Sequence, residues 1–318
     1  MYISIIIPNY NGADLISKNI PRLIKVVSEF QKSIGKQVEI IIVDDCSLDN
    51  SDAVIRSLVE KFENEKVRLI SFKTETNTGF SGTINLGAKN AKGEFLILLN
   101  SDAYPEDDFI SPSLPYFNKE NVYGVGFMDK SIEGEKIVLR GRGVGRWERG
   151  FLLHKRAEVD SNKTLWVNGG SCVVRKKVWD KLGGMDQLYN PFYWEDIDIS
   201  YRAQKSGYKV YFETKSIIVH EHEKGAIAKA FTPNQVKVIA YRNQVLFSWL
   251  NLTDTSLVVS HLLWLPYHIL RALLRKDHLF ISGFTKALIL LPKVIQSRNR
   301  RKPFYSLSDK EIIKEVSG

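Results

Sequence analysis

An acidic side chain, Asp102, directly follows the apolar run 95–99, which predicts a buried strand. In open α/β sheets, ligands bind outside the carboxyl ends of the strands. A carboxylate at that place can hold Mg²⁺ or Mn²⁺ against a phosphate, because these hard cations prefer oxygen ligands. The alternative is that Asn100-Ser101-Asp102 only turns the chain, since all three residue types favour turns.

Two adjacent acids, Asp44 and Asp45, close a second predicted strand over 39–43. Burying a charge is costly unless it finds a partner. One carboxylate can cap the following turn by accepting hydrogen bonds from backbone N–H groups. The other can accept a hydrogen bond from the ring N–H of a uracil or thymine. Turn capping alone remains the alternative.

Three acids within four positions, Glu195, Asp196 and Asp198, follow the aromatic pair Tyr193-Trp194. Desolvation and like charges raise carboxylate pKa values, and such groups are concentrated at functional sites. A carboxylate here could act as a general base toward an acceptor hydroxyl. If the segment begins a helix, the alternative is that the first two acids only favour the helix dipole. That alternative leaves the aromatic pair unexplained.

Two histidines, His220 and His222, follow an apolar run and would share one face of a strand. Neutral imidazole is a common metal ligand, so one of them could complete the coordination begun by Asp102. The spacing matches no zinc-finger or zincin pattern, and a solvated charged turn is the alternative. The glycine pair Gly169-Gly170 allows backbone to approach a ligand closely, or forms a plain turn.

Strands and helices alternate through the first hundred residues. The predicted strands cover 3–7, 39–43, 67–72 and 95–99, and helix-period segments cover 13–34 and 51–62. This alternation predicts βαβ units and a mostly parallel sheet in an α/β fold. Shorter strands and loops are expected from 160 to about 222, and one helix over 235–250.

An apolar stretch over 257–274 and a second over 280–295 lie in the basic C-terminal part of the chain. A membrane span needs about 20 apolar residues, but Ser260, His261, Pro266, His268 and Arg271 interrupt the first stretch. We therefore predict amphipathic helices that lie in a membrane interface, anchored by aromatic residues and arginines. Buried core helices and a true span are the alternatives.

Composition limits the class of protein. The chain has 318 residues, 44% hydrophobic and 25% charged, which is ordinary for a globular protein. Two cysteines form no disulfide framework, and the N-terminus lacks a basic signal-peptide region, so a cytoplasmic location is expected. The net charge of +9 attracts polyanions. Because apolar stretches surround the basic residues, we expect an anionic membrane surface and no nucleic acid as partner. The sequence leaves the oligomeric state open.

The order of the motifs is more specific than any one of them. In sequence they are Pro8-Asn9-Tyr10-Asn11-Gly12, Asp44-Asp45-x-Ser47-x-Asp49, Asn77-Thr78-Gly79-Phe80, Asn100-Ser101-Asp102, Asn168-Gly169-Gly170, Gly183-Gly184-Met185-Asp186, Trp194-Glu195-Asp196-x-Asp198-x-x-x-Arg202 and His220. This series resembles family-2 glycosyltransferases of the GT-A fold, most of all the rhamnosyltransferase-type branch, over about residues 2–225.

The resemblance implies a GT-A catalytic domain over 1–225, and the apolar and basic pattern beyond it predicts an amphipathic, membrane-associating helical region over 226–318. It implies inverting transfer of a sugar from a UDP- or dTDP-linked donor to a hydroxyl of a glycan or lipid-linked glycan. The reaction would serve cell-surface polysaccharide synthesis on the inner face of the cell membrane. A divalent cation, Mg²⁺ or Mn²⁺, is the implied cofactor.

Residue roles also follow from the resemblance. Asp196 matches the catalytic base, and Asp102 and His220 match the metal ligands, with His222 a weaker match. Asp44 is expected to be structural, and Asn100 stands where the family often has an acid, which puts the strength of metal binding in question. The expected nucleotide-binding residues are Pro8, Tyr10, Asp45, Asn77, Gly79 and Ser101, and those near the sugar and acceptor are Gly169, Gly170, Trp194 and Glu195.

Two other functions are compatible with parts of the sequence. A catalytically weakened, membrane-bound scaffold is suggested by Asn100 and the basic tail, but the intact pair Glu195-Asp196 and His220 argue against it. A sugar nucleotidyltransferase would use similar acidic metal ligands. It usually carries a basic, glycine-rich loop near the N-terminus, which Pro8-Asn9-Tyr10-Asn11-Gly12 does not provide.

Overall fold

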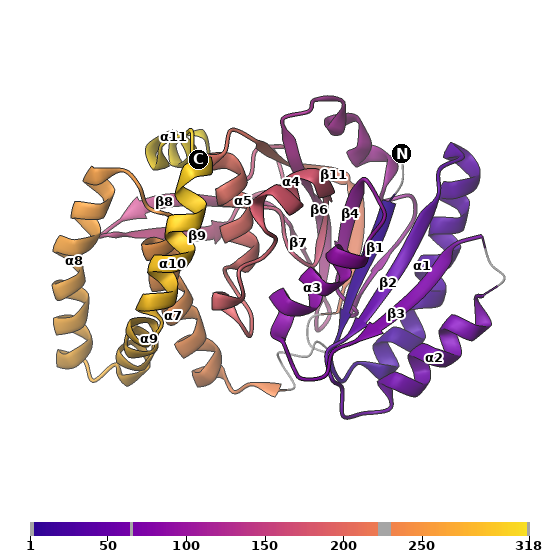
Figure 1. Ribbon diagram of the computed structural model, residues 1–318, viewed down its shortest axis with the longest axis horizontal. Coiled ribbons are helices and arrows are strands. Elements are labelled where there is room, and N and C mark those ends of the chain that lie inside the picture. The colour runs from indigo at the N-terminus through magenta and orange to yellow at the C-terminus, as the bar shows by residue number, and fades with distance from the viewer. Residues whose placement is uncertain (1–2, 64–65, 222–229, 317–318) are drawn as a thin grey trace.

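The computed structural model describes residues 3–63, 66–221 and 230–316 (Figure 1). Within them, a sheet of nine strands runs in the order β3-β2-β1-β4-β10-β6-β11-β5, and β7 pairs with β6. His222 and the predicted boundary at 225/226 lie outside the described residues.

The first half of the sheet is parallel, as its sequence pattern predicts. It consists of β1 (Ile3–Asn9), β2 (Val38–Asp44), β3 (Arg68–Lys73) and β4 (Phe95–Leu99). Every residue of β2 and β4 is buried, because helices cover both faces. Strands buried on both sides, such as β2 and β4, read as continuous apolar runs, whereas β3 at the edge of the sheet is only partly buried.

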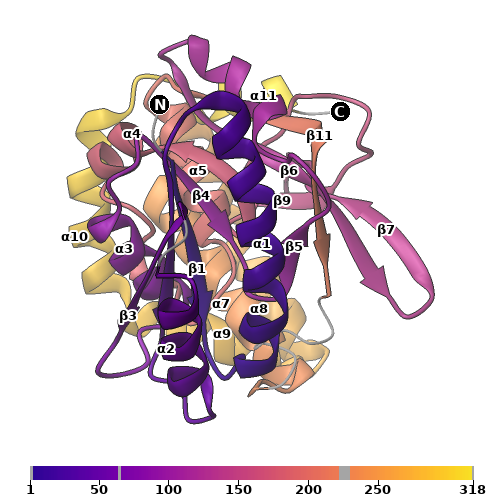
Figure 2. The same ribbon diagram turned by 90° about the vertical axis from the view of Figure 1, so that its right-hand side faces the viewer.

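Helices cover the two faces of this half separately. On one face α1 (Ala13–Ile34) and α2 (Ser51–Lys61) pack against side chains such as Ile5 and Ile40. On the other face α3 (Gly79–Asn90), α4 (Lys176–Leu182) and α5 (Glu195–Lys205) pack against Ile6 and Ile41. Figure 2 shows α1 lying along its face of the sheet.

The second half of the sheet is mixed. Strand β10 (Ser171–Arg175) lies antiparallel between β4 and β6 (Val122–Glu133). Strand β11 (Lys209–His220) runs parallel to β6 and antiparallel to β5 (Ala103–Pro105). The hairpin of β6 and β7 (Lys136–Arg140) projects from the sheet (Figure 2). Short 3-10 helices cover Ser111–Asn118, Gln187–Tyr189 and Lys302–Phe304.

A third core joins the C-terminal helices to a separate hairpin. The helices α7 (Pro233–Asn251), α8 (Thr255–Leu274), α9 (His278–Ile289), α10 (Leu291–Arg301) and α11 (Asp309–Val316) lie on the side away from α1 and α2 (Figure 1). Side chains from α5, from these helices and from the hairpin β8 (Gly143–Glu148) and β9 (Phe151–Arg156) form this core. The apolar patch predicted over 280–295 is divided between α9 and α10, which meet at a bend of 64°.

Candidate active site

The parallel strands β1, β2 and β4 end at one edge of the sheet (Figure 1). Pro8 is near the end of β1, and Tyr10 follows the strand. The loop after β4 lies beside the loop after β1, because a methyl group at Gly12 would be 3.6 Å from Ser101 Oγ. The topology therefore brings together motifs that are about ninety residues apart.

The two acids after β2 are held by different partners. Asp44 accepts hydrogen bonds from Asn9 Nδ2 (2.8 Å) and Ser47 Oγ (2.5 Å), so it ties together the loops after β1 and β2. Asp45 accepts hydrogen bonds from the backbone N–H of Thr78 (2.8 Å) and of Gly79 (2.9 Å), which fixes the start of α3. Asp44 thus has the structural contacts expected of it. Asp45 is buried too, and its predicted base contact would use the remaining lone pair on Oδ2.

Asn77 and Gly79 also belong to this loop. Asn77 Nδ2 donates to the carbonyl oxygen of Asp45 (3.4 Å), and its Oδ1 accepts from the N–H of Gly79 (3.2 Å). Gly79 has a φ of +69°, and a methyl group there would lie 2.9 Å from the Asn190 side chain. Only glycine combines that backbone conformation with that close approach. The loop before α3 therefore packs closely against Asn190, in the segment that precedes the acidic motif.

His220 connects the end of β11 to the end of β4. Its Nε2 lies 2.8 Å from Asp102 Oδ1, and its Nδ1 lies 2.8 Å from Asp129 Oδ2. Burial opposes protonation of this imidazole, but hydrogen bonds and Coulomb attraction from the two carboxylates prevail and raise the pKa of His220 to about 10. The predicted metal ligands Asp102 and His220 are thus in direct contact, and the sequence analysis missed Asp129.

The pair Asp102 and His220 fits a divalent cation. Their 2.8 Å contact is a hydrogen bond, so a cation bound here would replace the proton on His220 Nε2. No group of three or more His, Cys, Asp or Glu side chains able to hold a metal occurs in the described part of the chain. Such a cation would need further oxygen ligands, and Mg²⁺ is commonly held by one or two carboxylates together with substrate phosphates.

Asn100, the irregular position of this motif, packs closely against the glycine pair. Its backbone N–H donates to the carbonyl oxygen of Gly170 (3.0 Å), and a methyl group at Gly170 would lie 2.3 Å from its Nδ2. The same Nδ2 lies 3.4 Å from His220 Nε2. An acid at this position would place a third carboxylate beside His220, whereas the amide adds no charge.

The other predicted catalytic residue, Asp196, lies on the opposite side of the glycine pair. Its Oδ2 accepts a hydrogen bond from the N–H of Gly169 (3.3 Å). Burial raises the pKa of Asp196, and backbone hydrogen bonds from Ile197 and Gly169 only partly offset this. Burial, and then the charge of Asp196, hold the pKa of Glu195 well above its usual range. Glu195 therefore holds its proton more strongly than Asp196 does.

The aromatic pair before α5 has an unusual backbone. Tyr193 and Trp194 both have positive φ angles, +71° and +77°, which bulky residues rarely adopt and which are concentrated at functional sites. Trp194 is buried against Phe247 and His154, so it supports the site from the core. Tyr193 is 43% exposed, and it is the aromatic ring of the pair that a ligand can reach.

A residue of the C-terminal region holds this strained segment. Asn243 of α7 donates through Nδ2 to the carbonyl oxygens of Tyr189 (2.8 Å), Phe192 (2.9 Å) and Tyr193 (2.8 Å). Nothing in the sequence pattern singled out Asn243. The only available signal was an amide on the otherwise largely apolar inner face of a predicted helix.

Asp198, the third acid of the motif, is structural. It forms buried ion pairs with Arg202 (2.7 Å) and with Arg301 of α10 (2.6 Å). Although burial acts in the opposite direction, Arg301 and Arg202 lower the pKa of Asp198 to about 2. It therefore remains ionised under ordinary conditions and is no candidate for proton transfer.

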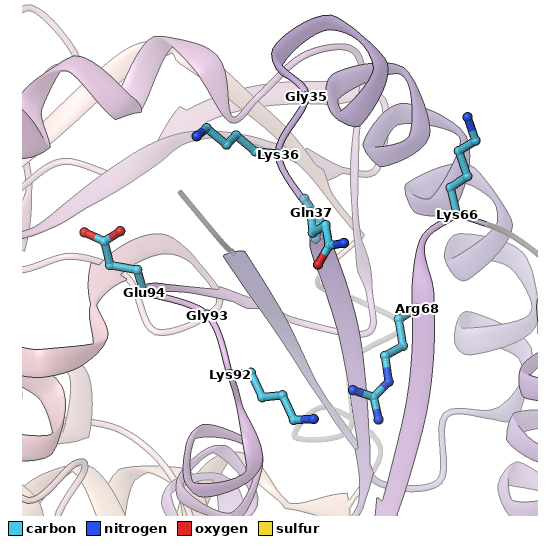
Figure 3. A pocket seen from close by; sticks show the side chains of 9 residues that line it. Gly35, Lys36, Gln37, Lys66, Arg68, Lys92, Gly93 and Glu94 are labelled. Atoms are coloured by element: carbon cyan, nitrogen blue, oxygen red, sulfur yellow. The ribbon is translucent and has the colours of Figure 1, made fainter.

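A cavity of about 1040 Å³ opens at the other edge of the sheet. Figure 3 shows the cationic side chains of Lys36, Lys66, Arg68 and Lys92 around it, with Glu94 at one side. These residues precede or begin strands, so the cavity lies at the amino ends of the strands. It is separate from the edge that carries Asp102, and we assign it no part in the chemistry.

Comparison with known proteins agrees with this geometry. The family model "Glycosyl transferase family 2" matches residues 4–183. The chain is 31% identical over 138 residues to the poly(ribitol-phosphate) beta-N-acetylglucosaminyltransferase TarS of Staphylococcus aureus, covering 43% of this chain and 22% of TarS. It is 36% identical over 147 residues to the poly(ribitol-phosphate) beta-glucosyltransferase of Bacillus spizizenii, covering 45% and 20%. The matches thus span about a fifth of each relative.

Solved structures resemble the whole chain. GalNAc-T7 with UDP, GalNAc and Mn²⁺ has a TM-score of 0.67 at 18% identity, covering 100% of this chain and 56% of that one. The 1–349 segment of S. aureus TarS with UDP-GlcNAc has a TM-score of 0.59 at 18% identity, covering 100% and 92%. The expected GT-A fold with additional C-terminal helices is confirmed.

Proposed function

The chain belongs to glycosyltransferase family 2, and from this premise we propose that it transfers a sugar from a nucleotide-diphosphate donor to a hydroxyl group. One observation carries the proposal. The glycine pair Gly169-Gly170 contacts Asp196 on one side and Asn100, next to the pair Asp102 and His220, on the other. A candidate base and a candidate diphosphate site therefore flank one short segment.

We propose a UDP- or dTDP-linked hexose or rhamnose as donor and a glycan or lipid-linked glycan as acceptor. The solved TarS complex with UDP-GlcNAc supports a uridine donor. The names of both curated relatives, which act on poly(ribitol-phosphate), support an acceptor that belongs to a cell-surface polymer. The rhamnosyltransferase-type branch rests on the motif order alone.

The proposed reaction is a single displacement with inversion. The acceptor oxygen forms a bond to the anomeric carbon while the bond from that carbon to the diphosphate oxygen breaks. Asp196 takes the hydroxyl proton, and its raised pKa makes it a better base than an ordinary aspartate. Glu195 stays protonated beside it, which avoids two adjacent negative charges.

Asp102 and His220 would hold Mg²⁺ or Mn²⁺. When bound, the cation supplies positive charge to the departing diphosphate. Asp129 accepts the Nδ1–H of His220 and so aims Nε2 at Asp102. Asp45 and Asn77 shape the loop that would receive the nucleotide, and exposed Tyr193 is placed to contact the sugar or acceptor.

The test begins with a panel of UDP- and dTDP-sugars, screened for Mn²⁺-dependent thermal stabilisation of the protein. With the selected donor, we expect Asp196→Asn to keep donor binding by calorimetry and to lower transfer by at least about 100-fold, the usual contribution of a general base. The exposed substitution Asp107→Asn is the matched control. Transfer by Asp196→Asn within a few-fold of the wild type would remove this residue from the base role.

A further readout separates an enzyme from a scaffold. A transferase releases nucleotide diphosphate from its donor slowly even without acceptor, since water can replace the hydroxyl. A protein that binds no donor in the panel and releases no nucleotide would contradict the proposed function.

A further inference from the structure

We propose that the exposed face of α8 to α10 docks on an anionic lipid surface, lying along it without crossing it. This surface is hereafter the apolar face. Of 18 exposed large hydrophobic side chains in the described residues, 13 lie between Val259 and Phe304. The most exposed leucines and isoleucine of the face are between 57% and 76% exposed: Leu262, Leu263, Leu270, Leu273, Leu274 and Ile289.

The exposed leucines of α8 follow the helical period. Leu263, Leu270 and Leu274 are separated by seven and four positions, so they project from one side of the helix. Figure 1 shows α8 at the outer edge of the molecule, at the end away from α1 and α2. Exposed apolar side chains that gather on one side of a helix in this way mark an interaction site on a protein.

The opposite side of α8 is bound to the β8–β9 hairpin. His261 Nδ1 lies 2.7 Å from the carbonyl oxygen of Gly150, and His268 Nε2 lies 2.8 Å from that of Arg149. Trp147 Nε1 donates to Ser260 Oγ (3.1 Å). The helix is therefore attached to the rest of the protein along its middle.

These contacts favour a helix on the membrane surface over the alternatives. By length and composition α8 could cross a bilayer, but only 17% of its most apolar window is buried, so it is not a core helix. A crossing α8 would draw the hairpin tip with exposed Arg146 and Arg149 into hydrocarbon, at a cost of several kcal/mol. An interfacial position leaves both arginines in water or among headgroups.

The basic residues around the apolar face indicate which kind of partner it binds. Residues 255–308 contain nine lysines and arginines and a single acid, Asp277. Arg298 binds the carbonyl oxygens of Trp249 and Leu252, and Arg301 pairs with acids of the core. The remaining seven are exposed: Arg271, Arg275, Lys276, Lys286, Lys293, Arg300 and Lys302.

Such a surface fits anionic lipid better than a second copy of the chain. Two copies meeting at the apolar face would bring like charges together. Anionic headgroups are attracted instead, by about 1 kcal/mol for each basic residue near the surface. Docking requires neither donor nor metal, so it goes beyond the proposed transfer reaction and can be tested without it.

The experiment measures co-sedimentation of the full chain with vesicles of phosphatidylcholine, with and without roughly one third phosphatidylglycerol. We expect binding to the anionic vesicles that weakens with salt. The variant Leu263→Glu/Leu270→Glu/Leu274→Glu should bind at least about tenfold less, since it places charges where apolar side chains enter the interface. These leucines are exposed, so the variant should fold, which circular dichroism checks.

Matched controls come from the β6–β7 hairpin. Ile137→Glu/Leu139→Glu changes exposed apolar residues elsewhere and should leave binding unchanged. Lys286→Glu/Lys293→Glu should reduce binding to anionic vesicles, whereas Lys136→Glu should not.

Four results would overturn the proposal. The wild type could fail to bind anionic vesicles, or the α8 variant could bind them as well as the wild type does. Light scattering could show a dimer that the α8 variant dissociates, which would make a second copy the occupant. Resistance of membrane-bound protein to alkaline carbonate would indicate a span. Nucleotide release in lipid-free buffer reports on the transferase separately.

Discussion

The imidazole of His220 lies between two carboxylates that have different surroundings. Asp102 follows β4 at the ligand-binding edge of the sheet, whereas Asp129 is fully buried in β6 and also accepts a hydrogen bond from Ser131 Oγ (3.0 Å). Histidines that bind metals usually donate their second ring N–H to such a carboxylate, which fixes the tautomer and the ring orientation. Asp129 is therefore a positioning residue for the proposed cation site.

We predict that Asp129→Asn weakens Mn²⁺ binding by about 10- to 100-fold, because the amide no longer fixes the Nδ1–H tautomer of His220. Titration of Mn²⁺ followed by electron paramagnetic resonance measures the change without any turnover. The exposed substitution Glu120→Gln serves as the control. Unchanged Mn²⁺ affinity in a folded Asp129→Asn protein would contradict the assignment.

The site residues were predictable where they follow strands that the sequence reveals. Asp102 and His220, 118 positions apart, were predicted as ligands of one metal, and they are in contact. Asp129 shows the same signal, an acid directly after an apolar run, but β6 was not recognised as a strand. Its glycines Gly124 and Gly126 interrupt the apolar pattern, and at Gly124 a methyl group would lie 2.9 Å from Val174 of the neighbouring strand.

Among the elements, α7 controls the segment before α5. Asn243 satisfies three carbonyl groups of that segment, and Arg242 donates to two carbonyl oxygens there as well, those of Tyr189 and Asn190. Backbone with positive φ at bulky residues persists only when its surroundings fix it. The strained conformation of Tyr193 and Trp194 therefore depends on a helix about fifty residues further along the chain.

We predict that Asn243→Ala lowers the free energy of unfolding by about 2–3 kcal/mol, because buried carbonyl groups lose their partner. It should also lower kcat more than it changes donor affinity, since the loop leads directly into Glu195-Asp196. Urea denaturation and steady-state kinetics measure the two effects. Asn234→Ala, an exposed amide in the first turn of α7, is the control, and equal effects of the two variants would argue against the positioning role.

The positions at which the helices end are only partly predictable from the sequence. The predicted helix over 13–34 matches α1, which ends at Gly35 with a φ of +68°, a common helix-terminating conformation. The sequence predicts one apolar patch over 280–295, but the chain bends at Leu290. Pro292 lies in the first turn of α10, where proline is tolerated. Pro266 lies inside α8 without ending it. Whether a proline lies at the start of a helix or inside one thus depends on tertiary contacts, which cannot be read from the sequence.

For the whole molecule, buried ion pairs join the sheet-packing helix α5 to the last helices. Arg301 at the end of α10 contacts both Asp198 and Asp186, and Lys205 of α5 pairs with Asp309 of α11 (2.7 Å). Burying these charges is tolerable only while all partners are present. The C-terminal helices are therefore held to the catalytic part by groups that cannot be removed singly.

We predict that Asp198→Asn lowers the free energy of unfolding at neutral pH by about 3–5 kcal/mol, because buried Arg202 loses its counter-charge and buried Arg301 keeps only Asp186. The ion pair of half-buried Lys176 with exposed Asp180 gives the control, and Asp180→Asn should cost less than about 1 kcal/mol. Denaturation midpoints in urea measure both.

The pH dependence gives a second measure of the same interaction. The folded-state pKa of Asp198, about 2, lies below the ordinary 3.8, so the unfolded chain takes up the proton first. The contribution of this carboxylate is complete above about pH 4 and is lost as the pH falls toward 2. The stabilities of wild type and Asp198→Asn should therefore converge in that range, and a difference that is independent of pH would contradict the assignment.

The contact between Asp198 and Arg301 joins residues 103 positions apart, and this distance has a consequence for synthesis of the protein. At about 5–20 residues per second, roughly 5 to 20 seconds pass between translation of the acid and of its partner. During that interval Asp198 has Arg202 of the same helix as a counter-charge but lacks its second ion pair. The part of the chain that carries the acidic motif is translated first, but α5 gains both of its ion pairs at Asp198 only after α10 has been made.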